Sequence, residues 1–339
     1  MSELISIITP TYNHERFIGS CIESVLAQTY PHWEMLIVND GSTDRTAEVA
    51  AEYAAKDARI KVINQANKGI YRLAENYNLA LAESKGDLIA VLEGDDIWLP
   101  HKLATQVEAM HKQPDAVLCW GCAYSANTDL SEKYELHPKQ LAKNIAFYDN
   151  SPVCNIYNVL FDDFLPPLTF LIRKSALQQL GGFVQSYKFP AVDLPTLMLL
   201  ARHGRFIFLN EVLGYWRVHA YQVTKTYGLD ILDSGRRIFT DNYKAMTEQQ
   251  RAVLRFGQKE IDGYYRDAEV ISFTRSGRFK LVRGEYASAR QDFGKALGMN
   301  GLAAPVWKLR AAIGWTLSWF NTDVETLAKW LGRASYKKR

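Results

Sequence analysis

The chain has 339 residues, which is enough for one large domain and a smaller second unit. Its composition of 47% hydrophobic and 23% charged residues excludes a disordered chain, and four cysteines are too few for a disulfide-stapled scaffold. The formal net charge of +3 is unevenly distributed, because residues 1–220 are net acidic and residues 221–339 are net basic. No motif in either part indicates binding to nucleic acid.

Strand-like and helical periodicity alternate regularly over the first 125 residues. Such alternation predicts a mixed, mostly parallel sheet with helices on both faces. An irregular stretch at 126–165 interrupts the pattern, which resumes with a helix at 194–201 and a strand at 205–209. The earlier strands are predicted at 4–9, 35–38, 61–64, 87–92 and 116–124, and the helices between them at 15–28, 43–55, 70–82 and 100–111.

Three polar clusters follow predicted strands, at residues 9–13, 39–44 and 93–96. In a parallel sheet the carboxyl ends of the strands meet at one edge, and ligands bind in the crevice beyond that edge. The coincidence of three polar clusters with three strand ends therefore predicts a binding site there.

The cluster at 93–96 is acidic. The carboxylates of Glu93, Asp95 and Asp96 repel one another unless a cation lies between them. A divalent ion with oxygen ligands and open positions for diphosphate oxygens fits this pattern. A solvated acidic turn after a strand is the alternative interpretation.

The first two clusters offer groups suited to a nucleotide. Thr9 and Tyr12 provide a hydroxyl for hydrogen bonding and an aromatic face for stacking on a base. Asp40 can accept a hydrogen bond from a pyrimidine N–H, and Gly41 permits the tight turn that follows it. For either cluster alone, ordinary turn and helix-cap chemistry is the alternative.

Taken in order, the motifs T-P-T-Y-N, V-N-D-G-S-T-D, N-K-G-x(6)-N and E-G-D-D resemble the inverting family-two glycosyltransferases with a GT-A fold. The resemblance runs over roughly residues 4–220. It implies that Thr9 and Tyr12 contact the donor base and that Asp40 recognises the uracil ring by a hydrogen bond. It places Lys68 in the loop bordering the nucleotide. It also implies that Asp95 and Asp96 are the carboxylates that contact the metal and the ribose, and that Asp96 is the direct metal ligand.

The same resemblance implies a catalytic base and two further contacts. Asp193, in the segment P-A-V-D-L ahead of an apolar helix, matches the family's catalytic aspartate, although an ordinary helix N-cap is the alternative without the family. His219 matches a histidine that contacts the metal or the diphosphate, with a structural histidine as the alternative. Arg217 matches a residue that either contacts phosphate or locks the fold.

The resemblance implies a transferase that requires Mn²⁺ or Mg²⁺ and inverts the anomeric configuration in one displacement. The donor is expected to be a nucleotide sugar, with UDP favoured by Asp40, although thymidine presents the same ring edge. The acceptor is expected to be a glycan or lipid-linked oligosaccharide in cell-surface polysaccharide synthesis. Two alternatives stay open: a sugar-phosphate nucleotidyltransferase, and a catalytically silent module that binds nucleotides or glycans.

After about residue 219 the pattern becomes helical, so we predict a catalytic domain over 1–220 and a helical region over 221–339. Pro305 opens a helix whose apolar residues recur every three or four positions, with tryptophans beside them and Lys337, Lys338 and Arg339 at the end. Such a helix suits either the membrane interface or packing on the catalytic domain or a second subunit. Neither a signal peptide nor an apolar run of about 18 residues is visible, so we expect a cytoplasmic protein that acts free or at the inner membrane face.

Overall fold

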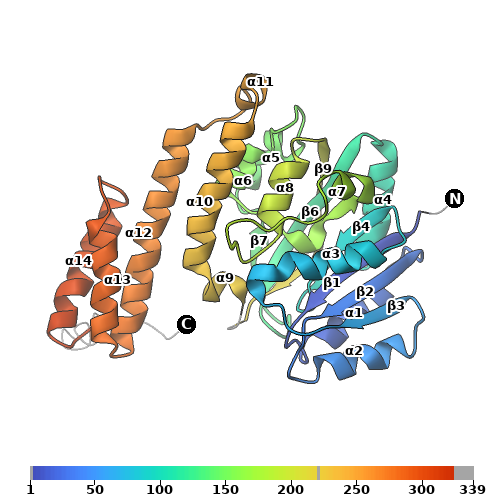
Figure 1. The fold of residues 1–339 in the computed structure, drawn as a ribbon, viewed down its shortest axis with the longest axis horizontal. Coiled ribbons are helices and arrows are strands. Elements are labelled where there is room, and N and C mark those ends of the chain that lie inside the picture. Colours follow the sequence, from blue (N-terminus) through green and yellow to red (C-terminus); the bar gives the residue numbers. More distant parts are fainter. Residues whose placement is uncertain (1–2, 220–221, 324–339) are drawn as a thin grey trace. The chain divides into compact units, whose positions relative to one another are not determined.

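The computed structural model describes residues 3–219 and 222–323, and the chain divides into two compact units (Figure 1). The first unit comprises Met1–Thr226 with Arg237–Arg255, and the second comprises Tyr227–Arg236 with Phe256–Arg339. The domain boundary that we expect near residue 220 stays a prediction, and the chain returns to the first unit for residues 237–255.

The described part of the first unit contains one mixed sheet of nine strands in the order β3-β2-β1-β4-β8-β6-β9-β5, with β7 paired to β6. Strand β1 runs parallel to β2 and β4, and β2 runs parallel to β3. Strand β8 is antiparallel to both β4 and β6, whereas β6 and β9 are parallel. The strands are β1 (Ile5–Thr11), β2 (Trp33–Asn39), β3 (Ile60–Asn64), β4 (Leu88–Val91), β5 (Ile97–Trp98), β6 (Ala116–Ala126), β7 (Lys133–His137), β8 (Leu171–Arg173) and β9 (Arg205–Arg217).

Every residue of β1 is buried, as expected for a strand with helices on both faces. Ile5 and Ile7 belong to one core cluster with Ile18 and Ile22 of α1. Burial of the isoleucine side chains of such a strand is a main source of stability for a parallel sheet. The helices of the first half are α1 (Ile18–Leu26), α2 (Thr46–Ala54), η1 (Ile70–Arg72), α3 (Leu73–Glu83) and α4 (Lys102–Lys112).

The predicted helix 15–28 begins later, at Ile18, because side chains of the next loop hold the preceding backbone in a turn. The amide of His14 donates to Thr46 Oγ1 (2.8 Å), and the amide of Glu15 donates to Asp44 Oδ2 (3.1 Å). These bonds join the segment that follows the first polar cluster to the end of the second cluster and the start of α2. In the predicted irregular stretch 126–165 the structure forms β7, α5 (Leu141–Tyr148) and α6 (Tyr157–Asp162).

The remaining elements of the first unit follow the irregular stretch. Strand β9 is longer than the predicted 205–209, and β5 is too short to leave a periodic signal. The helices here are η2 (Pro167–Thr169), α7 (Lys174–Gln179), α8 (Asp193–Leu200), α9 (Val223–Thr226), α10 (Gly228–Ala245, whose first part belongs to the second unit) and α11 (Glu248–Arg251).

Three helices build most of the second unit: α12 (Gln258–Val282), α13 (Tyr286–Gly298) and α14 (Pro305–Trp319). They meet at Phe293, whose ring lies within 3 Å of the place a Cβ would occupy at Gly277 and at Gly314. Pro305 opens α14, as predicted. The predicted continuation of its apolar stripe beyond residue 323, the capping box at 322–325 and the basic residues 337–339 lie outside the described residues.

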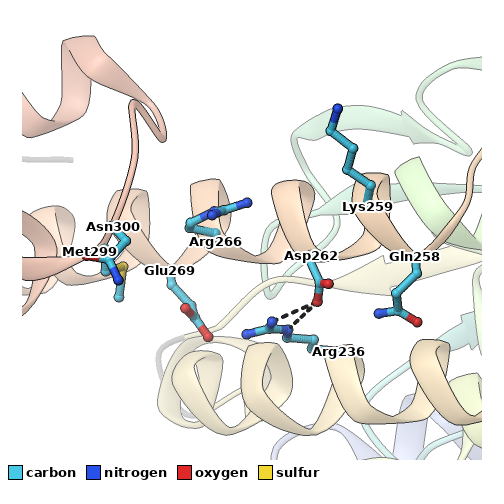
Figure 2. A pocket seen from close by; sticks show the side chains of 8 residues that line it. All are labelled: Arg236, Gln258, Lys259, Asp262, Arg266, Glu269, Met299 and Asn300. Atoms are coloured by element: carbon cyan, nitrogen blue, oxygen red, sulfur yellow. Dashed lines mark hydrogen bonds and ion pairs between the residues drawn. The ribbon is translucent and has the colours of Figure 1, made fainter.

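A polar groove also lies in the second unit, where the Arg236 guanidinium donates two hydrogen bonds to Asp262 Oδ1 (3.1 and 2.7 Å; Figure 2). Burial raises the pKa of Glu269, which also lines this groove. None of the site residues predicted from the sequence lines it. Among the described residues, no helix is long and apolar enough to cross a membrane.

Candidate active site

The three polar clusters meet at the carboxyl ends of β1, β2 and β4, which are neighbours in the sheet. The amide of Asp40 donates to the carbonyl of Thr11 (3.0 Å), and the amide of Gly94 donates to the carbonyl of Pro10 (3.1 Å). At Gly94 a Cβ would lie 2.5 Å from Thr11 Oγ1, so the acidic cluster needs glycine to approach β1 this closely. The parallel pairing therefore brings the three polar clusters to one edge of the sheet, and their roles in binding stay predictions.

The Asp40 carboxylate is buried and held by the loop after β3. Its Oδ1 accepts hydrogen bonds from Gln65 Nε2 and from the amide of Lys68, both at 2.9 Å. Asn67 Nδ2 donates to the Asp40 carbonyl (2.8 Å). The structure thus joins Asp40 to Lys68 through the backbone, while Lys68 Nζ lies 3.7 Å from Glu75 Oε2.

Thr9 and Tyr12 lie in contrasting surroundings. Thr9 is fully buried in β1, and its hydroxyl has no hydrogen-bond partner within the described parts of the chain. Tyr12 follows β1, and its side chain is exposed beside the cluster. The geometry gives Tyr12 the surface position that stacking on a base requires and places Thr9 in the interior. Both assignments as nucleotide contacts stay predictions.

Asp95 is the centre of a group of aromatic and imidazole rings. Its Oδ2 lies 3.0 Å from His219 Nε2 and 3.9 Å from His14 Nε2. The His219 ring stacks on Phe17, with centroids 5.2 Å apart. Burial alone would raise the pKa of Asp95, but the His14 and His219 imidazoles bring it below its ordinary value. The carboxylate is therefore kept ionised in a largely buried position.

The sequence interpretation did not single out His14, Gln65 or Asn67. His14 lies two residues beyond Tyr12, directly after the motif T-P-T-Y-N. Its Nδ1 is 3.2 Å from Thr11 Oγ1, which orients the ring towards Asp95. A histidine directly after a strand-end motif could be chosen from the sequence as a candidate site residue. Its position beside the acidic cluster depends on the fold.

Asp96 points into the protein and joins β9. Its Oδ1 accepts a hydrogen bond from the amide of Arg217 (3.0 Å), and its side chain is buried. Burial raises the pKa of Asp96 well above its ordinary value, and repulsion from Asp95 and Glu93 adds to the rise. The assignment of Asp96 as the direct metal ligand stays a prediction.

Arg217 acts as a clamp between segments that are distant in sequence. Its guanidinium donates to the Asp95 carbonyl (2.7 Å), to Ser20 Oγ (2.8 Å) and to the Thr128 carbonyl (3.1 Å). These bonds use donors on all three of its nitrogens and support the fold-locking interpretation of this residue. Contact with phosphate stays a prediction.

Glu93 lies in a partly buried position beside α3. Its Oε1 accepts a hydrogen bond from the Tyr77 hydroxyl (2.6 Å), whereas its Oε2 is buried and lacks a partner among the residues described. Burial raises the pKa of Glu93 to about 7, and the charges of Asp95 and Asp193 add to the rise. In the folded protein this carboxyl therefore keeps its proton well above the pH at which an exposed glutamate loses it.

Glu93→Gln is expected to raise the free energy of unfolding above that of the wild type, by an amount that grows as the pH rises. Below pH 4.5 both states of the wild type carry the proton; between 4.5 and about 7 the unfolded state loses it first, so this group's contribution to stability falls. Because glutamine does not titrate, the gap between variant and wild type should grow by about 2 to 3 kcal/mol from pH 4.5 to pH 8. Urea unfolding with a chelator present measures this gap. Glu52→Gln, at an exposed position, should show none, and a gap independent of pH would contradict the assignment.

Asp193 is the first residue of α8, and Val192 occupies the N-cap position without a capping hydrogen bond. The N-cap interpretation of Asp193 therefore does not describe how this helix begins. Its Oδ1 is buried, with no hydrogen-bond partner in the described part of the chain. Burial raises the pKa of Asp193, and its charge helps to raise the pKa values of Tyr77 and Glu93. Asp193 thus lies in the same electrostatic region as the acidic cluster.

The donor atoms at Asp95 suit a hard or borderline divalent ion. Within residues 3–219 and 222–323 no group of three or more His, Cys, Asp or Glu side chains is arranged to hold a metal. A carboxylate oxygen and an imidazole nitrogen nevertheless lie together, at Asp95 Oδ2 and His219 Nε2. Two such protein ligands would leave further coordination positions of Mn²⁺ or Mg²⁺ open to other oxygen donors.

The chain is similar to known sugar-transferring proteins. The family profile described as "Glycosyl transferase family 2" matches residues 6–179. The UDP-Glc:alpha-D-GlcNAc-diphosphoundecaprenol beta-1,3-glucosyltransferase WfgD of Escherichia coli is 44% identical over 110 residues, which are 32% of this chain and 42% of WfgD.

Two solved structures share the fold at low identity. S. aureus TarS 1–349 in complex with UDP-GlcNAc superposes with a TM-score of 0.59 at 17% identity, covering 99% of this chain and 93% of TarS. The mannosyltransferase PcManGT of Pyrobaculum calidifontis, in complex with GDP-Man and Mn²⁺, superposes with a TM-score of 0.57 at 16% identity, covering 93% of this chain and 88% of PcManGT. These likenesses confirm the predicted GT-A-type α/β fold with a helical C-terminal region. Since the family profile matches more than half of its residues, this chain belongs to glycosyl transferase family 2.

Proposed function

We propose that this protein transfers a sugar from a UDP-sugar to a hydroxyl group of a glycan or lipid-linked oligosaccharide, with inversion at the anomeric carbon and with a divalent metal. The observation that carries the proposal is the arrangement at the strand ends. There the Asp95 carboxylate contacts the His219 imidazole. Asp193, at the start of α8, adds a second carboxylate in the same acidic region, whose buried Oδ1 has no hydrogen-bond partner among the described residues. Family membership favours sugar transfer over nucleotidyl transfer.

In this mechanism Asp95 and His219 would hold Mn²⁺ or Mg²⁺, whose contribution is to neutralise the charge that develops on the leaving diphosphate. Arg217 holds the backbone of Asp95 and the side chain of Asp96 in place, so Asp95 is oriented before the donor binds. The low pKa of Asp95 keeps its carboxylate available as a ligand at neutral pH.

Asp193 would act on the acceptor. Its free Oδ1 can accept the proton of the attacking hydroxyl while that hydroxyl approaches the anomeric carbon from the side opposite the diphosphate. One displacement of this kind inverts the configuration. The raised pKa of Asp193 brings its basicity closer to neutral pH, where a general base is most effective.

Three observations support the choice of donor, metal and acceptor. The buried Asp40 carboxylate, held by the Lys68 loop, offers an acceptor for a uracil N–H beside the exposed Tyr12 ring. WfgD acts with UDP-Glc on a diphosphoundecaprenol-linked sugar, and PcManGT binds GDP-Man with Mn²⁺. A lipid-linked acceptor would place the reaction on the cytoplasmic side of the membrane.

A panel of UDP-, GDP- and dTDP-sugars, assayed with Mn²⁺ for release of nucleoside diphosphate in the presence of acceptor glycans, tests the proposal. We expect release from a UDP-sugar that stops when a chelator is added and returns with excess Mn²⁺. The product should carry the anomeric configuration opposite to that of the donor. Binding of UDP without release from any donor would instead identify a silent module.

A further inference from the structure

Helix α14 presents an apolar face to solvent. Leu309, Ile313 and Phe320 recur at helical spacing, and together with Val306 they are between 48% and 75% exposed. We call these four residues the α14 face. A surface helix in a globular protein normally has charged residues on its solvent-facing side, whereas this side of α14 carries apolar residues. A continuous exposed apolar surface of this kind marks an interaction site.

The opposite side of α14 already has its packing partners. Ala311, Gly314 and Ser318 are buried, and a Cβ at Gly314 would lie 2.3 Å from the Phe293 ring of α13. Figure 1 shows α12, α13 and α14 side by side in this unit. The core beneath α14 is therefore complete, and the α14 face is not required to fill it.

Tryptophans and arginines border the α14 face. Trp319 is 60% exposed, packs against Trp315 with ring centroids 5.7 Å apart, and lies under the Arg290 guanidinium, 4.4 Å from its centroid. On the other border, the exposed Arg310 lies 4.6 Å from the Trp307 ring. Indole rings beside basic groups suit the boundary between lipid headgroups and acyl chains.

The charge of this segment is predominantly positive. Helix α14 contains Lys308 and Arg310 but neither Asp nor Glu. The sequence beyond residue 323 has a single acidic residue, Glu325, against Lys329, Arg333, Lys337, Lys338 and Arg339. An anionic surface complements this charge, whereas a second copy of the same basic segment would repel it.

We propose that the α14 face binds the surface of a bilayer that contains anionic lipid, with the face inserted at the headgroup boundary and with Arg290 and Arg310 at the headgroups. The apolar face, the indole rings and the net positive charge are the features of an in-plane interfacial helix. This binding does not depend on the transfer reaction, so a failed activity assay would leave it standing.

Co-sedimentation of the full chain with lipid vesicles, without donor or metal, tests the proposal. We expect binding to vesicles that contain phosphatidylglycerol and much weaker binding to pure phosphatidylcholine. Leu309→Glu should lower the apparent affinity by about tenfold. The matched control Ile145→Glu replaces an apolar side chain that is 54% exposed in the first unit, and it should leave vesicle binding unchanged.

A second pair of variants tests the charge. Arg310→Glu should weaken binding to anionic vesicles by about fivefold or more at low salt, and the difference should shrink at high salt. Lys112→Glu, at an exposed position on α4, should have little effect. Circular dichroism and thermal unfolding would check that each variant keeps its fold.

Three results would overturn the proposal. The first is a wild-type protein that does not sediment with anionic vesicles. The second is a Leu309→Glu variant that is folded and binds like the wild type. The third is a wild-type protein that self-associates in analytical ultracentrifugation without binding lipid and becomes monomeric on Leu309→Glu, which would assign the α14 face to a second copy of the chain.

Discussion

Asp193→Asn is expected to lower kcat for sugar transfer by about 10³-fold while leaving the affinity for UDP and Mn²⁺ close to that of the wild type. Asparagine has nearly the same size, but its amide cannot take the proton of the acceptor hydroxyl. Because Val192, not Asp193, occupies the N-cap of α8 and forms no capping bond, the substitution should have little effect on helix stability. Steady-state kinetics and calorimetric titration with UDP measure the two effects separately.

The pH profile of the wild type gives an independent check on the same residue. Since burial raises the pKa of Asp193, transfer should fall on the acid side at a pH above the ordinary aspartate range, and Asp193→Asn should lack this limb. Asp115→Asn, at an exposed position, serves as the control and should retain both rate and profile. Undiminished turnover by Asp193→Asn would remove this residue from the mechanism.

Asp95→Asn is expected to reduce transfer by about 10³-fold for a different reason, because the residue acts on the leaving group. Asparagine keeps an oxygen near His219 Nε2 but loses the charge that a divalent ion requires. Both kcat and the Mn²⁺ concentration for half-maximal activity should change, and UDP should bind more weakly in the presence of Mn²⁺. This pattern separates Asp95 from Asp193, whose substitution leaves donor binding intact.

If Asp95 had only a structural role, Asp95→Asn would change a different set of measured properties. If the carboxylate only oriented His219, the variant would lose stability and its Mn²⁺ dependence would stay that of the wild type. His219→Gln provides the companion measurement, since it removes the imidazole nitrogen while leaving Asp95 charged. Loss of Mn²⁺ dependence in both variants is the expected result.

Much of the fold can be predicted from local patterns in the first 125 residues. Short runs rich in β-branched residues, such as 4–9, indicate strands, and β1 is buried throughout. The start of α1 could not be predicted, because its delay depends on Asp44 and Thr46, about 30 residues further along the chain. Strand β5 forms by pairing with β9, which is a long-range contact. A strand of two residues is too short to leave a periodic pattern in the sequence.

The candidate site was predictable where chemistry follows a strand end. Asp40, Asp95 and Asp96 all emerge from β2 or β4 at the expected edge. Sequence patterns do not show which way a carboxylate points, and the structure directs Asp96 towards the Arg217 amide and Asp95 towards His219.

Other parts of the site depend on side chains from separate elements. The bond between Tyr77 and Glu93 requires a glutamate long enough to reach α3, and the position of His14 beside Asp95 requires the pairing of β1 with β4. Neither contact leaves a periodic or compositional signal, because each joins residues whose separation in the sequence is arbitrary. Such contacts can be found only once the fold is known.

Calorimetric titration of the wild-type protein with UDP, with Mn²⁺ and then with a chelator, tests whether a divalent ion held at Asp95 takes part in donor binding. We expect UDP to bind at least tenfold more tightly with Mn²⁺, and Asp95→Asn to abolish this gain. An affinity for UDP that is the same with Mn²⁺, with Mg²⁺ and with chelator would contradict this expectation.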